Sequence, residues 1–441
     1  MRIIKASQYN IYFKAPDGVE MVFNSLSCGL AIVDNEYREL MASLTDLKKE
    51  LLDERMLTVY NDAVAGHFIV PDDFDEQLDF QTKRNIQKYS TDSLGLTIAP
   101  TLACNFKCVY CYETSKPGII SKETEEKLIQ YVDSQADRLK NLDVTWYGGE
   151  PLLAFDEIIY MSKAFLAICE KHKINYHAFM ISNGSLITDT IIDQMKSFKI
   201  QGVQITIDGP KNVHDQRRVS KNHTSSFDTI ISNVNKLLSN DIEVVLRINV
   251  DKTNESTLEE LIGYLHEKLI TEDIKITFGQ VTAYTEACRS VESSCYNNAE
   301  FAKKMAVYYG ILRRHGFQKA NPFPYPSAKL NYCCAELLNS YVVDHEGYMY
   351  KCWNDVGNTS HSIGNINDEH FDPYGYRNGD WLITDTIQSE PCKTCNILPL
   401  CVGGCPFNRR EGNYDSNCDL IKYNIEDVML TYYNYAKEGL L

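Results

Sequence analysis

The stretch LGLTIAPTLACNFKCVYCY, residues 94–112, joins a short apolar strand pattern to three closely spaced cysteines. Cys104, Cys108 and Cys111 have the spacing C-x3-C-x2-C. Three thiolates at this spacing can bind three irons of a cubane iron–sulfur cluster, which leaves the fourth iron open for a small ligand. A zinc site would need a fourth Cys or His nearby, and none follows within a short loop. Buried, unligated thiols are the other alternative.

Strand and helix patterns alternate regularly from this stretch to about residue 281. The predicted strands are Leu94–Ala99, Asp143–Tyr147, Tyr176–Ser182, Gly202–Asp208, Glu243–Val250 and Ile274–Val281. The predicted helices are Lys122–Leu139, Phe155–Lys171, Asp189–Ser197, Ser226–Ser239 and Thr257–Lys268. Six consecutive β-α units predict an α/β fold with a parallel sheet, either open or a partial barrel. In such folds the chemistry lies at the carboxyl ends of the strands.

The residues before this region have a different pattern and predict a small α+β module over residues 1–85. Two β-prone runs flank Pro16-Asp17-Gly18, which is a hairpin signal. A third strand and three helical stretches follow. The expected elements are strands at Tyr9–Lys14, Glu20–Phe23 and Gly29–Val33, and helices at Asn35–Leu44, Asp46–Arg55 and Asp75–Tyr89.

After about residue 283 the alternation stops and a second cysteine array begins. The chain becomes rich in Cys, Gly and Pro, with short β-prone pieces at Ser340–Asp344 and Tyr348–Lys351. This pattern predicts a segment organised by metal rather than by a large core. The array has the spacing C-x12-G-x4-C … C-x2-C-x5-C-x3-C … C, formed by Cys334, Gly347, Cys352, Cys392, Cys395, Cys401, Cys405 and Cys418. Zinc is the alternative metal for the C-x2-C pair.

Composition limits the classes of function that remain. The 441 residues are 44% hydrophobic and 24% charged, as in ordinary globular domains, and the net charge of −16 argues against nucleic-acid or anionic-membrane binding. The amino-terminal residues lack the apolar region of a signal peptide, and no apolar run approaches a membrane span, so we expect a cytoplasmic protein. In a reducing compartment, clustered cysteines are expected to bind metal or to catalyse reactions rather than to form disulfides.

With an aromatic residue before its last cysteine, the first motif resembles the signature of the radical S-adenosylmethionine (SAM) superfamily. The second array resembles the SPASM extension of radical enzymes that modify peptides. The resemblance implies a partial (β/α)6 TIM-like barrel in which Cys104, Cys108 and Cys111 hold a catalytic [4Fe–4S] cluster. The amino and carboxylate groups of SAM would occupy the open iron. One-electron transfer would then yield methionine and a 5′-deoxyadenosyl radical.

The same resemblance implies which strand ends hold the cofactor. Gly149 and Glu150 would bind the methionine amino group, and Arg217 or Arg247 its carboxylate, with Arg217 preferred. The polar side chains at the ends of the third and fourth strands would contact the ribose or the carboxylate, residues at the ends of the fifth and sixth strands would face the nucleoside, and the Tyr110 backbone would meet adenine. These further residues are Ser182, Asn183, Thr206, Asp208, Asn249 and Val281.

In SPASM proteins the cysteine array holds two auxiliary [4Fe–4S] clusters, so the resemblance implies three clusters in all. The outer one would be bound by Cys392, Cys395, Cys401 and Cys418, and the inner one by Cys334, Cys352 and Cys405. A fourth inner ligand is missing from residues 326–330. We hypothesise that this leaves an open iron for a cysteine thiolate of the substrate. The remaining cysteines are interpreted as unligated thiols: Cys28, Cys169, Cys288, Cys295 and Cys333.

The module at residues 1–85 resembles the winged-helix-type element that recognises the leader of ribosomal precursor peptides, where the leader adds a strand to a sheet edge. A structural cap or a dimerisation module is the alternative. The implied domains are residues 1–85 for leader recognition, 90–283 for the radical SAM core, 284–331 as a bridge and 332–441 for SPASM.

The whole pattern is similar to thioether-forming maturases of the sactipeptide and ranthipeptide type. The implied partners are a precursor peptide with a leader and a Cys-containing core, and an electron donor such as flavodoxin or ferredoxin. Formylglycine formation, carbon–carbon crosslinking and a non-enzymatic zinc scaffold are the alternatives. No residue is identified as a catalytic base.

Overall fold

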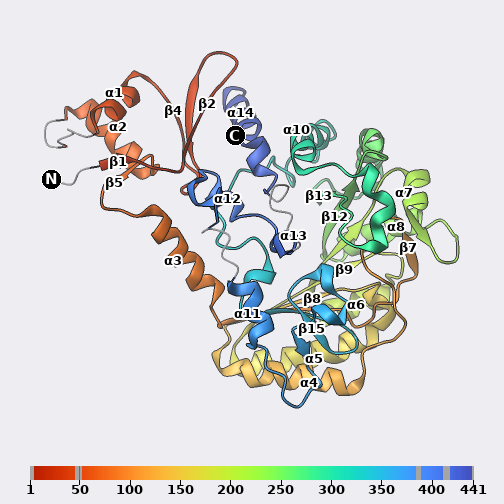
Figure 1. Cartoon of the computed structure of the whole chain (residues 1–441). Coiled ribbons are helices and arrows are strands. Elements are labelled where there is room, and N and C mark those ends of the chain that lie inside the picture. The colour runs from red at the N-terminus through yellow and green to blue at the C-terminus, as the bar shows by residue number, and fades with distance from the viewer. Residues whose placement is uncertain (1–3, 45–48, 50–51, 384–388, 411–417, 440–441) are drawn as a thin grey trace. The chain divides into compact units, whose positions relative to one another are not determined.

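The computed structural model describes residues 4–44, 49, 52–383, 389–410 and 418–439 (Figure 1). The chain divides into two compact units. The first contains Met1–Lys88, Pro324–Cys333 and Thr384–Leu441, and the second contains Tyr89–Phe323 and Cys334–Ile383. This division rests on contacts within the chain and does not assign functions. The functional domains expected from the sequence therefore remain a prediction.

The second unit is built on a nine-stranded sheet in the order β13-β12-β10-β9-β8-β6-β14-β15-β16. Neighbouring strands from β13 to β6 all run parallel, in the reverse of their chain order, which confirms the predicted α/β fold and its six β-α units. In the described chain β13 pairs only with β12, so the six strands form a partial barrel rather than a closed one. Their bounds are β6 Ser93–Ile98, β8 Asn141–Trp146, β9 Asn175–Ser182, β10 Ile200–Thr206, β12 Glu243–Val250 and β13 Lys275–Gln280.

Helices α5, α6, α8 and α10 of the second unit pack on strands of this sheet. In α8 the buried residues recur at helical spacing, for example Phe227, Ile230, Val234 and Leu237. Helices α4 and α5 lie side by side (Figure 1). The helices are α4 Lys122–Gln135, α5 Phe155–His172, α6 Asp189–Ser197, α7 Lys211–Arg217, α8 Phe227–Ser239, α9 Leu258–Lys268, α10 Asn298–Arg314 and α11 Tyr376–Ile383.

Two groups of short strands complete the second unit. Strand β7 (Phe106–Cys108) pairs with β11 (Arg218–Ser220), which lies more than a hundred residues further along the chain. Strand β14 (Ser340–Val343) adds to the free side of β6 in parallel, followed by antiparallel β15 (Tyr348–Tyr350) and β16 (Gly364–Asn365). The β-prone pieces predicted after residue 283 therefore do form strands, and these strands extend the central sheet.

The first unit contains the predicted hairpin and its helices. Strands β2 (Asn10–Lys14), β3 (Glu20–Asn24) and β4 (Leu30–Ile32) form a three-stranded antiparallel sheet, as expected. Gly18 has φ +91° in the tight turn between β2 and β3, a conformation that favours glycine. The other elements are β1 Ile4–Ala6, β5 Ile69–Pro71, α1 Asn35–Ser43, α2 Glu54–Ala65, α3 Glu76–Lys88, α12 Leu398–Cys401, α13 Pro406–Arg410 and α14 Ile421–Lys437.

The predicted helix at Asp46–Arg55 falls largely on residues 45–48 and 50–51, which lie outside the described residues. The helix that the structure describes next is α2, which begins at Glu54. Its N-cap is Asp53, whose side chain accepts a hydrogen bond from the Met56 N–H.

Carboxyl-terminal residues belong to the same core as the amino-terminal module. Tyr9 and Phe80 share one apolar cluster with Leu398 and Val402. On the surface, Asp17 accepts hydrogen bonds from the Tyr433 hydroxyl at 2.9 Å and from Lys437 Nζ at 2.8 Å. Residues 1–85 are therefore not an isolated domain, because part of the core they share comes from the end of the chain.

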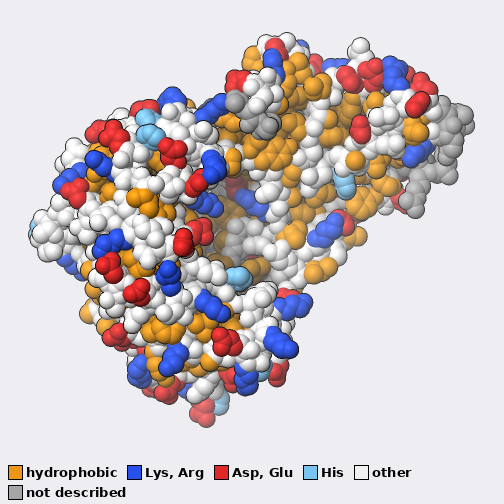
Figure 2. Space-filling view, turned by 180° about the vertical axis from the view of Figure 1, so that it is seen from behind, with side chains coloured by type: hydrophobic (Ala, Val, Ile, Leu, Met, Phe, Trp, Pro, Cys, Tyr) orange, Lys and Arg blue, Asp and Glu red, His pale blue; other side chains and the backbone are white. Residues whose placement is uncertain are grey.

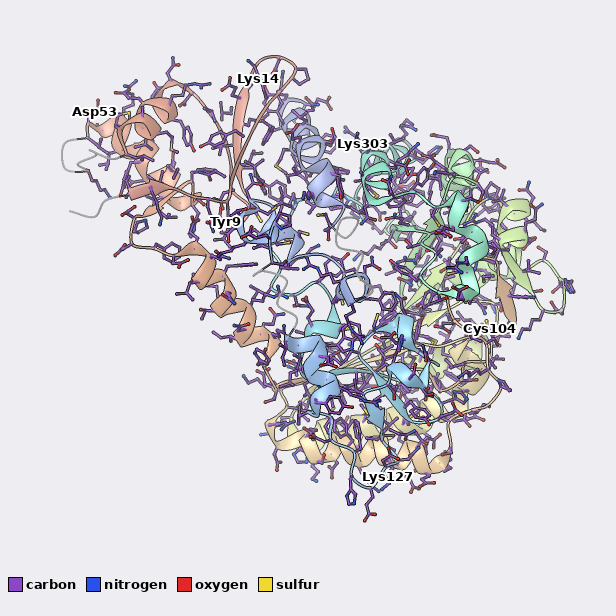
Figure 3. All side chains as sticks on the ribbon, viewed as in Figure 1. Tyr9, Lys14, Asp53, Cys104, Lys127 and Lys303 are labelled. Atoms are coloured by element: carbon purple, nitrogen blue, oxygen red, sulfur yellow. The ribbon has the colours of Figure 1, made fainter. Side chains whose placement is uncertain are left out.

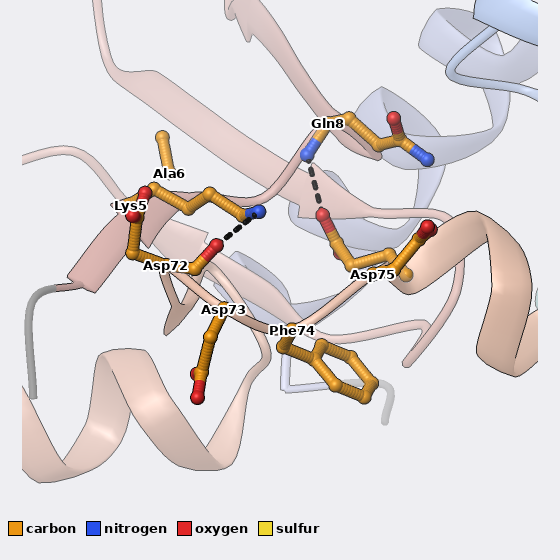
Figure 4. Close-up of a pocket in the computed structure, with 8 residues that line it drawn as sticks. Lys5, Ala6, Gln8, Asp72, Asp73, Phe74 and Asp75 are labelled. Carbon is orange, nitrogen blue, oxygen red and sulfur yellow. Dashed lines mark hydrogen bonds between the residues drawn. The ribbon is translucent and has the colours of Figure 1, made fainter.

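A cavity of about 350 Å³ lies in the first unit where β1 and β5 meet the start of α3 (Figure 4). Its lining includes Lys5, Asp72, Asp73 and Asp75. Lys5 Nζ donates to the Asp72 carbonyl at 2.8 Å, and the Gln8 N–H donates to the side chain of Glu76 at 3.0 Å. These bonds fix the direction in which α3 leaves the small sheet.

The described surface carries charged side chains of both signs. On the described part of the face shown in Figure 2, acidic and basic side chains are interspersed and no broad basic area is present. None of the helices in the described chain combines the length and the apolar character needed to cross a membrane.

Candidate active site

The first cysteine motif lies on the loop after β6 and on β7, at the carboxyl end of the parallel strands (Figure 3 labels Cys104). The three thiols are near enough for their charges to interact. Burial, reinforced by neighbouring thiolates and carboxylates, raises the pKa of Cys104 to about 11. A thiol in such a place favours its neutral form until a metal binds and deprotonates it.

No group of three or more His, Cys, Asp or Glu side chains in the described residues is arranged to hold a single metal ion. A cubane cluster has a different requirement, because each thiolate binds its own iron. The three thiols are therefore a candidate for a cluster.

The turn Gly148-Gly149-Glu150 packs directly against the loop that carries Cys104. A Cβ at Gly149 would lie 2.3 Å from the Ala103 carbonyl oxygen, and one at Gly148 would lie 2.3 Å from that of Thr101. Gly148 also has φ +114°. Only glycine fits this close approach of two backbones, so the turn holds the cysteine loop in place.

Glu150 is fully buried at this turn, and burial raises the pKa of its carboxyl group. It accepts hydrogen bonds from the Leu152 N–H at 3.1 Å, the Ser182 hydroxyl at 2.8 Å and the Asn183 N–H at 2.8 Å. A carboxylate has about four acceptor positions, so one is left for a further donor. This arrangement fits the ammonium group that the sequence resemblance places here.

The third strand end is tied to the cysteine loop. The Asn183 side chain donates to the Asn105 side-chain oxygen at 2.7 Å, and the Asn105 amide donates to the Ser185 hydroxyl at 3.0 Å. The predicted residues Thr206 and Val281 are also buried, at the ends of β10 and just beyond β13. The structure thus brings strand ends from across the sheet to one edge.

The fourth and fifth strand ends meet at Asp208, which is fully buried. Its carboxylate accepts hydrogen bonds from the Asn249 N–H at 2.9 Å and from the Tyr110 hydroxyl. Burial raises the pKa of Asp208, while the Arg218 guanidinium opposes that rise. Both carboxylate oxygens of Asp208 therefore have partners within the protein.

The two arginines proposed for the SAM carboxylate lie in different environments. Arg217 is buried, forms an ion pair with Asp251 at 3.0 Å and donates to Thr253 at 2.7 Å. Its Nε makes no hydrogen bond in the described chain and lies 3.9 Å from a carboxylate oxygen of Asp208. Arg247 lies within β12, where its Nε donates to the side-chain oxygen of Asn249 at 2.8 Å. Arg217 Nε is thus a buried donor without a hydrogen bond, whereas Arg247 Nε already has one, so Arg217 fits an anionic group better than Arg247 does.

Sequence reasoning missed Arg218, the residue after Arg217. Arg218 is also buried, and its Nη1 donates to the Tyr110 hydroxyl at 2.8 Å. Its Cα is the partner of Cys108 in the β7–β11 pair. The sequence signal that could have identified it was the doubled arginine itself, because only one of the two is needed for a carboxylate.

A polar aromatic group beside Cys111 was also missed. The hydroxyls of Tyr112 and Tyr147 are hydrogen-bonded to each other, and the Tyr147 ring lies 4.7 Å from that of Trp353. Burial raises the pKa of the neighbouring Glu113 to about 7, although a hydrogen bond from Tyr147 lowers it in part. One Glu113 carboxylate oxygen is buried without a hydrogen-bond partner in the described chain.

The second cysteine array falls on both units. Cys334 precedes β14 and Cys352 follows β15, so the antiparallel pairing places both at the same end of that hairpin. Gly347, with φ +83°, lies in the turn between the strands. Cys405 belongs to the first unit, and the grouping of these three cysteines as ligands of one cluster remains a prediction.

The four cysteines proposed for the outer cluster all belong to the first unit. Burial raises the pKa of Cys401 to about 11, with the charges of Asp419 and Cys418 adding to the rise. The Asp419 N–H donates to Cys401 Sγ at 3.4 Å, and Arg409 donates to Cys392 Sγ at 3.7 Å. Donors of this kind commonly stabilise thiolate ligands of iron–sulfur clusters.

Among the other cysteines, Cys169 is buried on α5 in the same helical face as Phe165 and Ile168, as expected for a small apolar side chain. Cys288 is buried as well, and its thiol donates to the Thr285 carbonyl.

Residues 98–265 match the model of the Radical SAM superfamily. This segment contains the three cysteines, the Gly148-Gly149-Glu150 turn and the ends of β8, β9, β10 and β12. Residues 98–265 therefore form a radical SAM domain.

Curated proteins and solved structures resemble a larger part of the chain than the family model covers. The cysteine-type anaerobic sulfatase-maturating enzyme of Clostridium perfringens (strain 13) is 24% identical over 370 residues, covering 75% of this chain and 93% of that enzyme. The solved structure of anSMEcpe with AdoMet and the Cp18Cys peptide has a TM-score of 0.59 at 20% identity, and covers 78% of this chain and 99% of its own. Streptococcus suis SuiB bound to its precursor peptide SuiA has a TM-score of 0.53 at 15% identity, and covers 95% of this chain and 98% of its own.

Proposed function

We propose that this chain is a radical SAM maturase that forms thioether crosslinks in a ribosomally made precursor peptide. The observation that carries the proposal is the combination of a radical SAM domain with a first unit that joins an α+β module to cysteine-bearing segments. The likeness to SuiB spans 95% of the chain, against 78% for anSMEcpe, which supports a maturase with an added peptide-binding module.

In this proposal the residues at the sheet edge bind and orient the cofactor. Glu150 accepts the methionine ammonium at its remaining acceptor position, and Arg217 offers the carboxylate its Nε, which makes no hydrogen bond in the described chain. When bound, SAM and its cluster supply the 5′-deoxyadenosyl radical that removes a hydrogen atom from a carbon of the peptide. The expected set of three [4Fe–4S] clusters and an electron donor such as flavodoxin or ferredoxin belongs to this proposal.

The choice of sulfur chemistry follows from the second array. Residues 326–330 contain no cysteine, so the inner set has three candidate ligands and leaves a position for a substrate thiolate. A second candidate function is formylglycine formation, which is favoured by the 24% identity over 93% of the sulfatase-maturating enzyme.

The two functions and carbon–carbon crosslinking give different products on a Cys-containing precursor peptide incubated with SAM and reductant. A thioether forms with the loss of one hydrogen from carbon and one from sulfur, so we expect a mass loss of two hydrogens and a cysteine that iodoacetamide no longer alkylates. A carbon–carbon crosslink gives the same mass loss but leaves the thiol reactive. Formylglycine formation removes the sulfur. Either of the last two products would contradict the thioether proposal.

The proposal assigns leader recognition to an edge of the three-stranded sheet of the first unit. Strand β2 ends in Lys14, a charge of the kind that protects sheet edges, whereas β4 (Leu30–Ile32) has no charged residue. The Val33 N–H donates to the Glu20 carbonyl at 2.8 Å, so the alternation of an antiparallel ladder points the Ile32 N–H away from β3. Ile32 is 57% exposed. We therefore assign the leader to the β4 edge.

Replacing Ile32 with proline should weaken leader binding at least tenfold, because it removes an outward N–H without breaking the β3–β4 ladder. The measurement is the affinity for a fluorescently labelled leader peptide, with thermal stability followed in parallel. Ile32→Thr is the matched control, because it changes the side chain and keeps the N–H. Equal affinity of the proline variant and the wild type would exclude this edge. Deleting residues 1–85 would be a poorer test of leader binding, because it would also remove Tyr9 and Phe80 from the core that they share with Leu398 and Val402.

A further inference from the structure

Arg218 lies closer to the first cysteine motif than its place in the sequence suggests. It is the first residue of β11, and its Cα is the antiparallel partner of Cys108 on β7. Its guanidinium carbon lies 5.8 Å from the centre of the Phe106 ring, which belongs to the same strand as Cys108. Only 8% of Arg218 is exposed. A permanent positive charge is thus buried beside a proposed ligand of the cluster.

This charge has little compensation from direct partners. In the described chain the Arg218 guanidinium donates to the Tyr110 hydroxyl at 2.8 Å, has no carboxylate within 4.0 Å, and leaves its Nε without a partner. The nearest acid in this network is Asp208, which accepts from the other side of the Tyr110 hydroxyl. Arg217 differs, because it forms an ion pair with Asp251.

The field of Arg218 acts on the charged groups around the motif. The charges of Cys108, Tyr110 and Asp208 all stabilise the guanidinium, and Arg218 in turn favours the thiolate form of Cys108. Because Arg218 and Asp208 are buried and Cys108 and Tyr110 are half-buried, water screens their interactions less than it does at the surface.

A cubane core held by three thiolates is singly negative when oxidised and doubly negative after it takes up one electron. A buried cation nearby stabilises the reduced state more than the oxidised state, and so raises the reduction potential. We propose that the buried charge of Arg218 raises the reduction potential of the cluster bound by Cys104, Cys108 and Cys111. Arg218 thus makes this cluster easier to reduce without binding it. The electron comes from a low-potential one-electron donor. This inference rests on the radical SAM part of the proposed function and not on the choice of peptide product.

The test is an anaerobic redox titration of the full-length, cluster-loaded protein without SAM, followed by electron paramagnetic resonance. The signal of this cluster is identified as the one that changes when SAM is added afterwards. In Arg218→Met we expect the ratio of reduced to oxidised cluster at a fixed potential to fall at least tenfold, which corresponds to about 59 mV for one electron. In Arg218→Lys, which keeps a positive charge, this ratio should fall less than threefold.

Lys107→Met is the matched control, because Lys107 precedes Cys108 on the same strand but its side chain is exposed. Losing this screened charge should change the ratio less than threefold. If Arg218→Met fails to retain iron, Arg218→Gln removes the charge while keeping a donor for Tyr110, and the same tenfold fall is expected.

An unchanged ratio in the neutral Arg218 variants would overturn the inference, as would an equal fall in Arg218→Lys. A variant that loses only SAM affinity, with its potential in the absence of SAM unchanged, would place Arg218 in cofactor binding and would also overturn it. The potential is measured without peptide, so failure of the thioether proposal leaves this result intact. Conversely, an unchanged potential in a variant that still forms crosslinks would reject only the role of Arg218.

Discussion

Cys108→Ala should reduce the formation of 5′-deoxyadenosine from SAM to background in anaerobically reconstituted protein supplied with a strong reductant. Cys108 lies in the β7–β11 pair, and without its thiolate one iron of the cluster loses its protein ligand. We also expect the iron content to fall from about twelve to about eight per chain, since each of three cubane clusters holds about four irons. Product is measured by liquid chromatography and iron by a colorimetric assay.

Cys169→Ala is the matched control for this substitution. Cys169 is a buried thiol of α5 in the same unit, and its loss removes only one sulfur atom from an apolar face. Iron content and 5′-deoxyadenosine formation should stay at the wild-type level. If Cys108→Ala still released 5′-deoxyadenosine at the wild-type rate, the assignment of the first motif as the catalytic cluster would be wrong.

Gly149→Ala should have the second largest effect. The new Cβ would lie 2.3 Å from the Ala103 carbonyl oxygen and 2.7 Å from that of Leu102, and neither backbone atom can move aside as a flexible side chain would. Overpacking of this kind costs about 1–3 kcal/mol. Because the displaced loop carries Cys104, we expect SAM affinity and 5′-deoxyadenosine formation to fall at least tenfold. The measurements are thermal unfolding and SAM binding by equilibrium dialysis.

Gly310→Ala provides the contrast. Gly310 lies inside α10, where an added Cβ would approach no atom closer than the Arg314 side chain at 3.7 Å. Alanine should stabilise the helix by about 1 kcal/mol and leave SAM binding unchanged. Equal stability and equal SAM binding in Gly149→Ala and the wild type would show that the Gly148-Gly149 turn does not position the cysteine loop.

The regular part of the fold could be predicted from the sequence because its signals are local. The strand Glu243–Val250 and the helix Asp189–Ser197 were predicted with the bounds that the structure gives them. Their apolar residues recur with the period of a strand or a helix, and each pattern is long enough to be recognised. The cysteine motifs were equally visible, because spacing alone carries their signal.

The pairings that build the surroundings of the site could not be predicted in the same way. Strands β7 and β11 have only three residues each, so neither is long enough to show the alternating pattern of a strand. They also lie about a hundred residues apart in the sequence. Without that pairing, nothing in the sequence places Arg218 beside Cys108. The position of Glu113 next to Tyr147 likewise depends on how the loop after β7 meets β8.

The place of β14 beside β6 has a consequence for any form of the chain that lacks residues 340–343. The central sheet does not end where the radical SAM domain ends, because a strand from residues 340–343 covers one flank of β6. In a chain that lacked the carboxyl-terminal extension, that flank of β6 would carry unpaired amides and carbonyls, which form a template for self-association.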